Sequence, residues 1–212
     1  MTKLPEQPDL ALLAALGPEE HLLDAGTQCW RVYFKGGAHP TQWNSFRDFG
    51  PTGSRFDHHV PPRHSQTRAV LYGAVGHTAV ATCLAEVFQD TRTINRSRRD
   101  PWLVVFELTR EVRLHSLCGL WPTRAGASTN ISSGPKHKAR NWSRAIYETY
   151  GTIEGLYFGS SMNANEPAFA LYERAVAALP LMPAGNWSLA DSRLDSRLNA
   201  AGTHLNYRVW PP

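Results

Sequence analysis

An arginine, a tyrosine and a glutamate stand in settings that could place them around one ligand. Arg55 follows Gly53 in the turn-forming sequence Gly-Ser-Arg-Phe, Tyr72 lies in a short apolar stretch, and Glu86 lies in a helix-like segment after it. A guanidinium binds phosphate through paired hydrogen bonds, and a tyrosine ring stacks on an aromatic base. A carboxylate stabilises positive charge that develops beside it. These residues therefore predict a site for a phosphorylated aromatic ligand whose reaction passes through a cation.

Two further residues extend the pattern in both directions. Arg31 lies upstream in Trp-Arg-Val, and Ser160 ends the downstream sequence Gly-Leu-Tyr-Phe-Gly-Ser. The ordered series Arg, Gly-x-Arg-Phe, Leu-Tyr, Ala-Glu and Gly-Leu-x-Phe-x-Ser resembles the RES domain family, whose members are bacterial toxins that consume NAD. The resemblance runs from about Trp30 to about Ala178. It implies an NAD pocket lined by Arg31, Arg55, Tyr72, Glu86 and Ser160.

Two positions depart from the usual pattern of that family. Asp57 follows Arg-Phe where the family commonly has asparagine, and Ser161 follows the late serine where the family commonly has arginine. The second departure removes a cation, so it bears on how the diphosphate of NAD would be bound at that corner.

The chemistry that the resemblance implies needs only one carboxylate. When the bond between nicotinamide and ribose breaks, nicotinamide leaves as a neutral base, so no general acid is required, unlike ordinary glycoside hydrolysis with its two carboxylates. Glu86 is the predicted catalytic residue, and such a group is worth about 3–4 kcal/mol at a transition state.

The other residues would bind the substrate. Arg31 and Arg55 would bind the diphosphate, although ion pairs with Asp48 or Asp57 would also explain these two arginines. Gly53 would allow close approach of the backbone, Tyr72 would stack or belong to the core, and Ser160 would bond a ribose hydroxyl or phosphate.

Composition describes a soluble globular chain. Of its 212 residues 42% are hydrophobic and 19% are charged, which fits one decorated domain. No apolar run reaches the roughly 20 residues of a membrane span, and the first residues are not a basic and then apolar signal, so we expect a cytoplasmic protein. Cys29, Cys83 and Cys118 form no CxxC pair and predict reduced, buried thiols.

The charge of the chain is carried by arginine. The net charge is +4, with 18 arginines and 4 lysines. This excess of arginine suits the binding of a phosphorylated ligand, an acidic partner or nucleic acid. A GC-rich genome, which encodes arginine in place of lysine, would also explain it. The basic connector 92–99 is interpreted as a solvated loop, with a phosphate or partner contact as the alternative. His58, His59 and His64 lack ligand spacing, so a polar loop is expected and no metal site.

Periodicity predicts an α+β fold of mostly antiparallel strands with packed helices. We divide the chain into an N-terminal helical lead-in (1–28), a catalytic domain (29–179) and a C-terminal extension packed on it (180–212). The resemblance implies a split, twisted β core like that of ADP-ribosyltransferase toxins. Helices are expected at 9–16, 18–23, 78–88 and 138–150, and a short helix in the C-terminal extension is expected to reach about residue 199. Strands are expected at 29–34, 69–74, 155–158, 168–172 and 205–210, with 102–108 and 112–117 forming a hairpin; 35–69 and 119–135 are expected to be irregular.

The leading functional hypothesis is a bacterial toxin that cleaves NAD and transfers ADP-ribose to water or phosphate. NAD would be a substrate rather than a cofactor, since the dinucleotide-binding GxGxxG is absent, as are a P-loop and a GxSxG elbow. The resemblance implies an antitoxin partner that blocks the pocket. The alternatives are ADP-ribosylation of a protein, a basic nucleic-acid-binding module without catalysis, and an inactive protein-binding member of the family.

Overall fold

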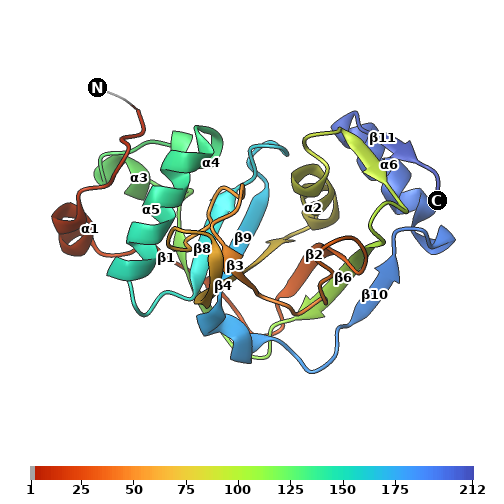
Figure 1. Cartoon of the computed structure of the whole chain (residues 1–212), viewed down its shortest axis with the longest axis horizontal. Helices are drawn as coiled ribbons and strands as arrows, with labels where there is room; N and C mark the ends of the chain where they lie inside the picture. The colour runs from red at the N-terminus through yellow and green to blue at the C-terminus, as the bar shows by residue number, and fades with distance from the viewer. Residues whose placement is uncertain (1–2) are drawn as a thin grey trace.

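The computed structural model describes residues 3–212 and is built on one large sheet (Figure 1). Its strand order is β1-β7-β8-β9-β4-β2-β6-β10, with β3 pairing on β4, and a separate parallel pair joins β5 to β11. All neighbours in the large sheet are antiparallel except β7 and β8. The expected α+β class with a mostly antiparallel sheet is confirmed. The strands are β1 (Glu20–Leu23), β2 (Gln28–Phe34), β3 (Arg47–Gly50), β4 (His64–Val75), β5 (Thr93–Asn95), β6 (Pro101–Glu107), β7 (Val112–Ser116), β8 (Gly155–Gly159), β9 (Pro167–Tyr172), β10 (Gly185–Ser188) and β11 (Arg208–Trp210).

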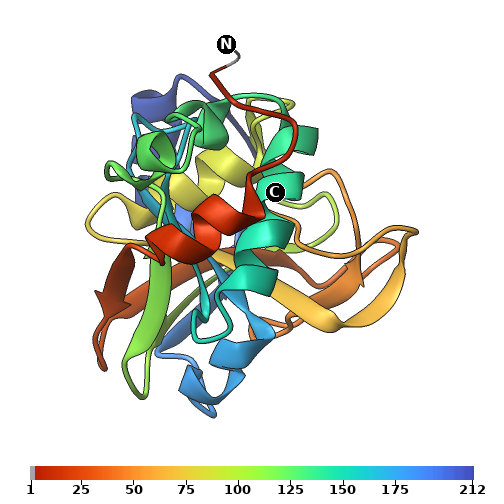
Figure 2. The same cartoon turned by 90° about the vertical axis from the view of Figure 1, so that its left-hand side faces the viewer.

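Helices cover the sheet in two groups (Figures 1 and 2). One group lies over β8 and β9 and packs around the buried Trp121 and Trp142. The other lies near β2 and β6 and packs around Leu84 and Leu198. The first group is α1 (Leu10–Leu16), α3 (Trp121–Arg124), α4 (Asn130–Ser133) and α5 (Lys136–Thr149); the second is α2 (Ala79–Val87) and α6 (Asp195–Leu205); short 3₁₀ turns are η1 (Glu173–Ala178) and η2 (Ser192–Leu194).

The sheet splits between β2 and β4. These strands pair only at Cys29 with Val75 and at Trp30 with Ala74. Beyond Trp30, β2 continues along β6 as far as Phe34, while β4 stays with β9 and β3. Helix α2 packs on both β2 and β4 where they diverge (Figure 1). The expected split of the β core is therefore present, and it leaves room between the two strands.

Both ends of the chain pack against these layers. The Trp142 indole on α5 donates to the Pro5 carbonyl at 3.1 Å, and the Tyr150 hydroxyl donates to the Leu13 carbonyl at 2.8 Å. Asp9 caps α1 by accepting from the amides of Ala11 and Leu12. At the other end, α6 packs on α2.

Two expected elements are wrong in type or pairing. Residues 20–23 form strand β1 rather than a helix, because this segment pairs with β7 in the sheet. The segments 102–108 and 112–117 do not form a hairpin with each other. Strand β6 lies between β2 and β10, and β7 lies between β1 and β8. Pairing with strands distant in the sequence has overridden the short connection.

Three boundaries also differ from expectation. The segment 35–69 contains β3 and the first residues of β4, and the segment 119–135 contains α3 and α4. Helix α6 runs to Leu205 instead of about 199 and is ended by Asn206 in the left-handed conformation.

Candidate functional site

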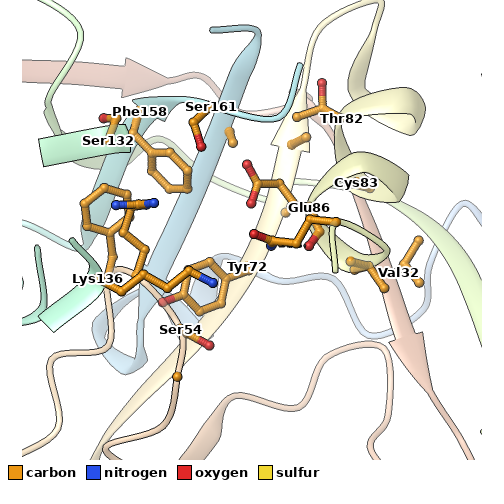
Figure 3. Close-up of a pocket in the computed structure, with 18 of the residues that line it drawn as sticks. Val32, Ser54, Tyr72, Thr82, Cys83, Glu86, Ser132, Lys136, Phe158 and Ser161 are labelled. Carbon is orange, nitrogen blue, oxygen red and sulfur yellow. Dashed lines mark hydrogen bonds between the residues drawn. The ribbon is translucent and has the colours of Figure 1, made fainter. Parts of the chain in front are cut away.

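An open cavity of about 580 Å³ lies where β2 and β4 diverge (Figure 3). Its walls come from the loop before β4, from β4 itself, from α2 and from the start of α5. The volume is in the range of small-molecule sites. Four of the residues predicted from the sequence line it: Gly53, Arg55, Tyr72 and Glu86.

Glu86 projects from α2 into this cavity (Figure 3), and the buried Ser160 is bonded to it. The Ser160 hydroxyl donates to Glu86 Oε1 at 2.5 Å. Ser160 is fully buried at the end of β8 and is not among the residues that line the cavity. The structure thus brings Ser160 and Glu86 together, with the carboxylate between the serine and the open space.

Arg55 reaches the cavity from the loop between β3 and β4. Its neighbour Phe56 is fully buried and packs on Phe158 with ring centroids 4.5 Å apart, so the Arg-Phe pair turns one side chain inward and the other to the cavity. Arg55 Nη1 donates to the carbonyl of Gly134, which precedes α5 by two residues. Burial lowers the pKa of Arg55, and the negative charge of Glu86 opposes that effect.

Asp57 holds the loop that carries Arg55. It accepts hydrogen bonds from the Thr52 amide at 2.7 Å and the Thr52 hydroxyl at 2.8 Å, lies 2.6 Å from His59 Nδ1, and pairs with Arg47 at 3.0 Å. Burial alone would raise the pKa of Asp57, but the bonds from His59 and Thr52 and the charge of Arg47 outweigh it and hold the pKa well below its usual range. The residue that departs from the family pattern therefore anchors this turn. The expected polar loop is wrong for His58 and His59, which are fully buried.

Tyr72 presents its ring to the same cavity, while its hydroxyl lies in the interior. Its ring lines the cavity from β4, and its hydroxyl is buried without a hydrogen-bond partner among residues 3–212. Burial raises the pKa of the phenol, so it remains neutral at physiological pH.

Arg31 lies outside the lining of the cavity. Its Nη1 donates to the carbonyls of Trp43 at 2.9 Å and Ser45 at 3.0 Å, and burial lowers its pKa to about 10. Within residues 3–212, neither Arg31 nor Arg55 forms an ion pair with Asp48 or Asp57. Asp57 pairs with Arg47 instead. The structure gives Arg31 the task of fastening the 43–45 segment to β2.

Sequence reasoning missed a lysine and several hydroxyl groups. Lys136, Ser54, Ser132 and Ser161 also line the cavity (Figure 3). Lys136 stands just before the helix that was expected from 138, and no local pattern marks it. The sequence marks Ser161 only as the position where the family commonly has arginine.

Other expectations about sites have separate outcomes. Within residues 3–212, no group of three or more His, Cys, Asp or Glu side chains is arranged to hold a metal ion. No helix in the same range is long and apolar enough to span a bilayer. Cys29 and Cys83 are buried as expected, but Cys118 is exposed.

Comparisons with known proteins agree with this architecture. None of the curated proteins matches the chain. A chain in the crystal structure of the M. tuberculosis MbcT–MbcA toxin–antitoxin complex has a similar fold, with a TM-score of 0.57 and 14% sequence identity over 90% of this chain and 96% of that one. At this identity the similarity concerns the fold alone. The family model of the RES domain matches residues 28–191, and the chain therefore belongs to the RES domain family.

Proposed function

We propose that the protein cleaves NAD at the bond between nicotinamide and ribose and transfers ADP-ribose to water or phosphate. The observation that carries this proposal is the Glu86 carboxylate, held by the buried Ser160 hydroxyl at 2.5 Å and facing a cavity that also contains Arg55 and Tyr72. Membership of the RES domain family supports the same choice.

In this reaction the C–N bond breaks and its electron pair goes to the pyridinium nitrogen, which releases neutral nicotinamide. The ribose becomes an oxocarbenium-like cation, and Glu86 stabilises it from α2. Water or phosphate then adds to the cation, and the product loses one proton to solvent. Arg55 would bind the diphosphate through its free N–H groups, and the Tyr72 ring would stack on the bound nucleotide.

The proposed role is that of a toxin with an antitoxin partner. It is supported by the family and by the similar fold in a toxin–antitoxin complex. We propose that the antitoxin covers the open mouth of the cavity, which would exclude NAD.

Incubation with NAD, with and without phosphate, followed by product identification by mass spectrometry, tests the activity. We expect nicotinamide together with ADP-ribose or its 1-phosphate. Glu86→Gln should slow nicotinamide release roughly 100–1000-fold, the usual effect of removing one stabilising group at a transition state. Glu111→Gln is the matched control, because Glu111 is an exposed glutamate that does not line the cavity.

Release of nicotinamide within threefold of the parent by Glu86→Gln would remove Glu86 from the mechanism. If NAD stays intact at high enzyme concentration, the proposed cleavage is wrong, and labelled NAD with cell extract then tests ADP-ribosylation of a protein.

A further inference from the structure

Lys136 is a cation of the cavity that the proposed chemistry does not use. It is the first residue of α5, and its side chain extends into the space beside Tyr72 (Figure 3). It forms no ion pair and no side-chain hydrogen bond with residues 3–212. Lys138, two residues further on, is engaged: it donates to the Leu4 carbonyl at 3.1 Å and lies 3.8 Å from Glu6.

The fold brings Arg55 to the same segment. Its Nη1 is bonded to the carbonyl of Gly134, two residues before Lys136, and both side chains line the cavity. Arg55 comes from the loop before β4 and Lys136 from α5, so the tertiary structure brings the two cations to the same cavity. Of the carboxylates in the lining, Glu86 is already bonded to Ser160 and Asp90 lies beyond the end of α2.

The start of α5 adds to this positive field. The helix has 14 residues, no acidic residue in its first turn and no side chain that caps its first amides. The positive end of its dipole is therefore not neutralised locally. Two cations and a helix N-terminus suit a ligand with two adjacent negative charges.

We propose that Lys136 is a specificity-determining residue which, together with Arg55, binds a diphosphate and so selects dinucleotides over nucleosides. The inference rests on the proposed function for the identity of the substrate and deepens it. Arginine orients the group through its planar fork, while lysine contributes a point charge with less demand on geometry. Ser161, elsewhere in the lining, offers a hydroxyl without charge.

Three variants and three substrates test this assignment. Lys136→Met removes the charge at similar length, Lys136→Arg keeps it, and Lys138→Met is the matched control on the same helix. Nicotinamide release is measured with NAD, with nicotinamide mononucleotide and with nicotinamide riboside, which carry a diphosphate, one phosphate and none. We expect Lys136→Met to lower kcat/KM for NAD about 10–150-fold, mainly through KM, as for the loss of a hydrogen bond to a charged group. The loss should be smaller with the mononucleotide and absent with the riboside, and Lys136→Arg should return to within about threefold of the parent.

Equal losses on all three substrates, or none on NAD, would overturn the inference.

Binding of ADP, with adenosine as reference, separates this inference from the proposed reaction. Calorimetry of ADP requires no turnover, and we expect Lys136→Met to weaken ADP at least tenfold and adenosine by less than twofold. If NAD is not cleaved but ADP binding depends on Lys136, the proposed function fails and the diphosphate site stands. If NAD is cleaved but neither kcat/KM for NAD nor the affinity for ADP changes in Lys136→Met, the diphosphate site is wrong and the proposed function stands.

Discussion

Replacing Ser160 by alanine tests whether this serine acts on the substrate or through Glu86. The serine is fully buried and lies outside the cavity lining, and its hydroxyl donates to Glu86 Oε1 at 2.5 Å. A hydrogen bond to a charged group is worth about 1.5–3 kcal/mol, so losing it at the transition state would lower kcat/KM roughly 10–150-fold. We expect Ser160→Ala to fall in that range, with kcat affected more than KM, because the bond positions the carboxylate that meets the developing cation.

The double variant Ser160→Ala/Glu86→Gln distinguishes the two roles. If the serine works only through the carboxylate, the double variant should release nicotinamide within about threefold of Glu86→Gln alone, since groups that act as a unit are not additive. Ser160 Oγ also accepts from the Met162 amide at 3.2 Å, so thermal unfolding of each variant must accompany the kinetics. Ser65→Ala, at an exposed serine of β4, is the matched control.

Two results would refute this reasoning. Additive losses in the double variant would mean that Ser160 contacts the substrate directly. Nicotinamide release by Ser160→Ala within threefold of the parent, in a protein of unchanged melting temperature, would mean that the bond contributes nothing to the reaction.

Two further predictions concern stability. Arg31→Met should lower the free energy of unfolding in urea by about 1–3 kcal/mol, because it leaves the carbonyls of Trp43 and Ser45 unpaired, while KM for NAD changes less than threefold; a tenfold rise in KM at unchanged stability would make Arg31 a substrate ligand. Burial lowers the pKa of His115 to about 4, so between about pH 6.5 and 4 the unfolded chain binds a proton that the native state does not. Native stability should therefore decrease as pH falls through this window, by up to about 3 kcal/mol from this group, and His115→Leu should reduce that decrease in urea titrations. An unchanged pH dependence in the variant would contradict the assignment.

The sequence predicted the part of the cavity whose residues are close along the chain. Arg55, Tyr72 and Glu86 belong to a consecutive turn, strand and helix, and the periodicity of each segment places its side chains locally. A strand that feeds a helix across a short turn leaves few ways to arrange the two. Their presence at one cavity follows from local structure, which sequence patterns describe well.

The remaining lining residues depend on tertiary structure. Lys136 comes from a helix that follows β7 in the chain and meets the cavity through the bond from Arg55 to Gly134. The positions of β6 and β7 in the sheet have the same origin, since each pairs with strands distant in the sequence. Which strand becomes a neighbour depends on packing over the whole sheet, and a short connecting turn does not determine it.

The divergence of β2 from β4 helps to explain why Arg55 lines the cavity and Arg31 does not. Side chains on a strand alternate between its faces, so Arg31 and Val32 cannot both point into the cavity. Val32 lines it, and Arg31 points to the other face, where the carbonyls of residues 43 and 45 accept from it. A strand pattern alone allows either orientation, because the choice depends on which face of β2 the helix α2 covers. Arg55 lies on a loop without this alternation, and its direction is set instead by the burial of Phe56 and by the anchoring of Asp57. The cationic side of the cavity is therefore built by a loop and a helix start, and the strand arginine serves the scaffold.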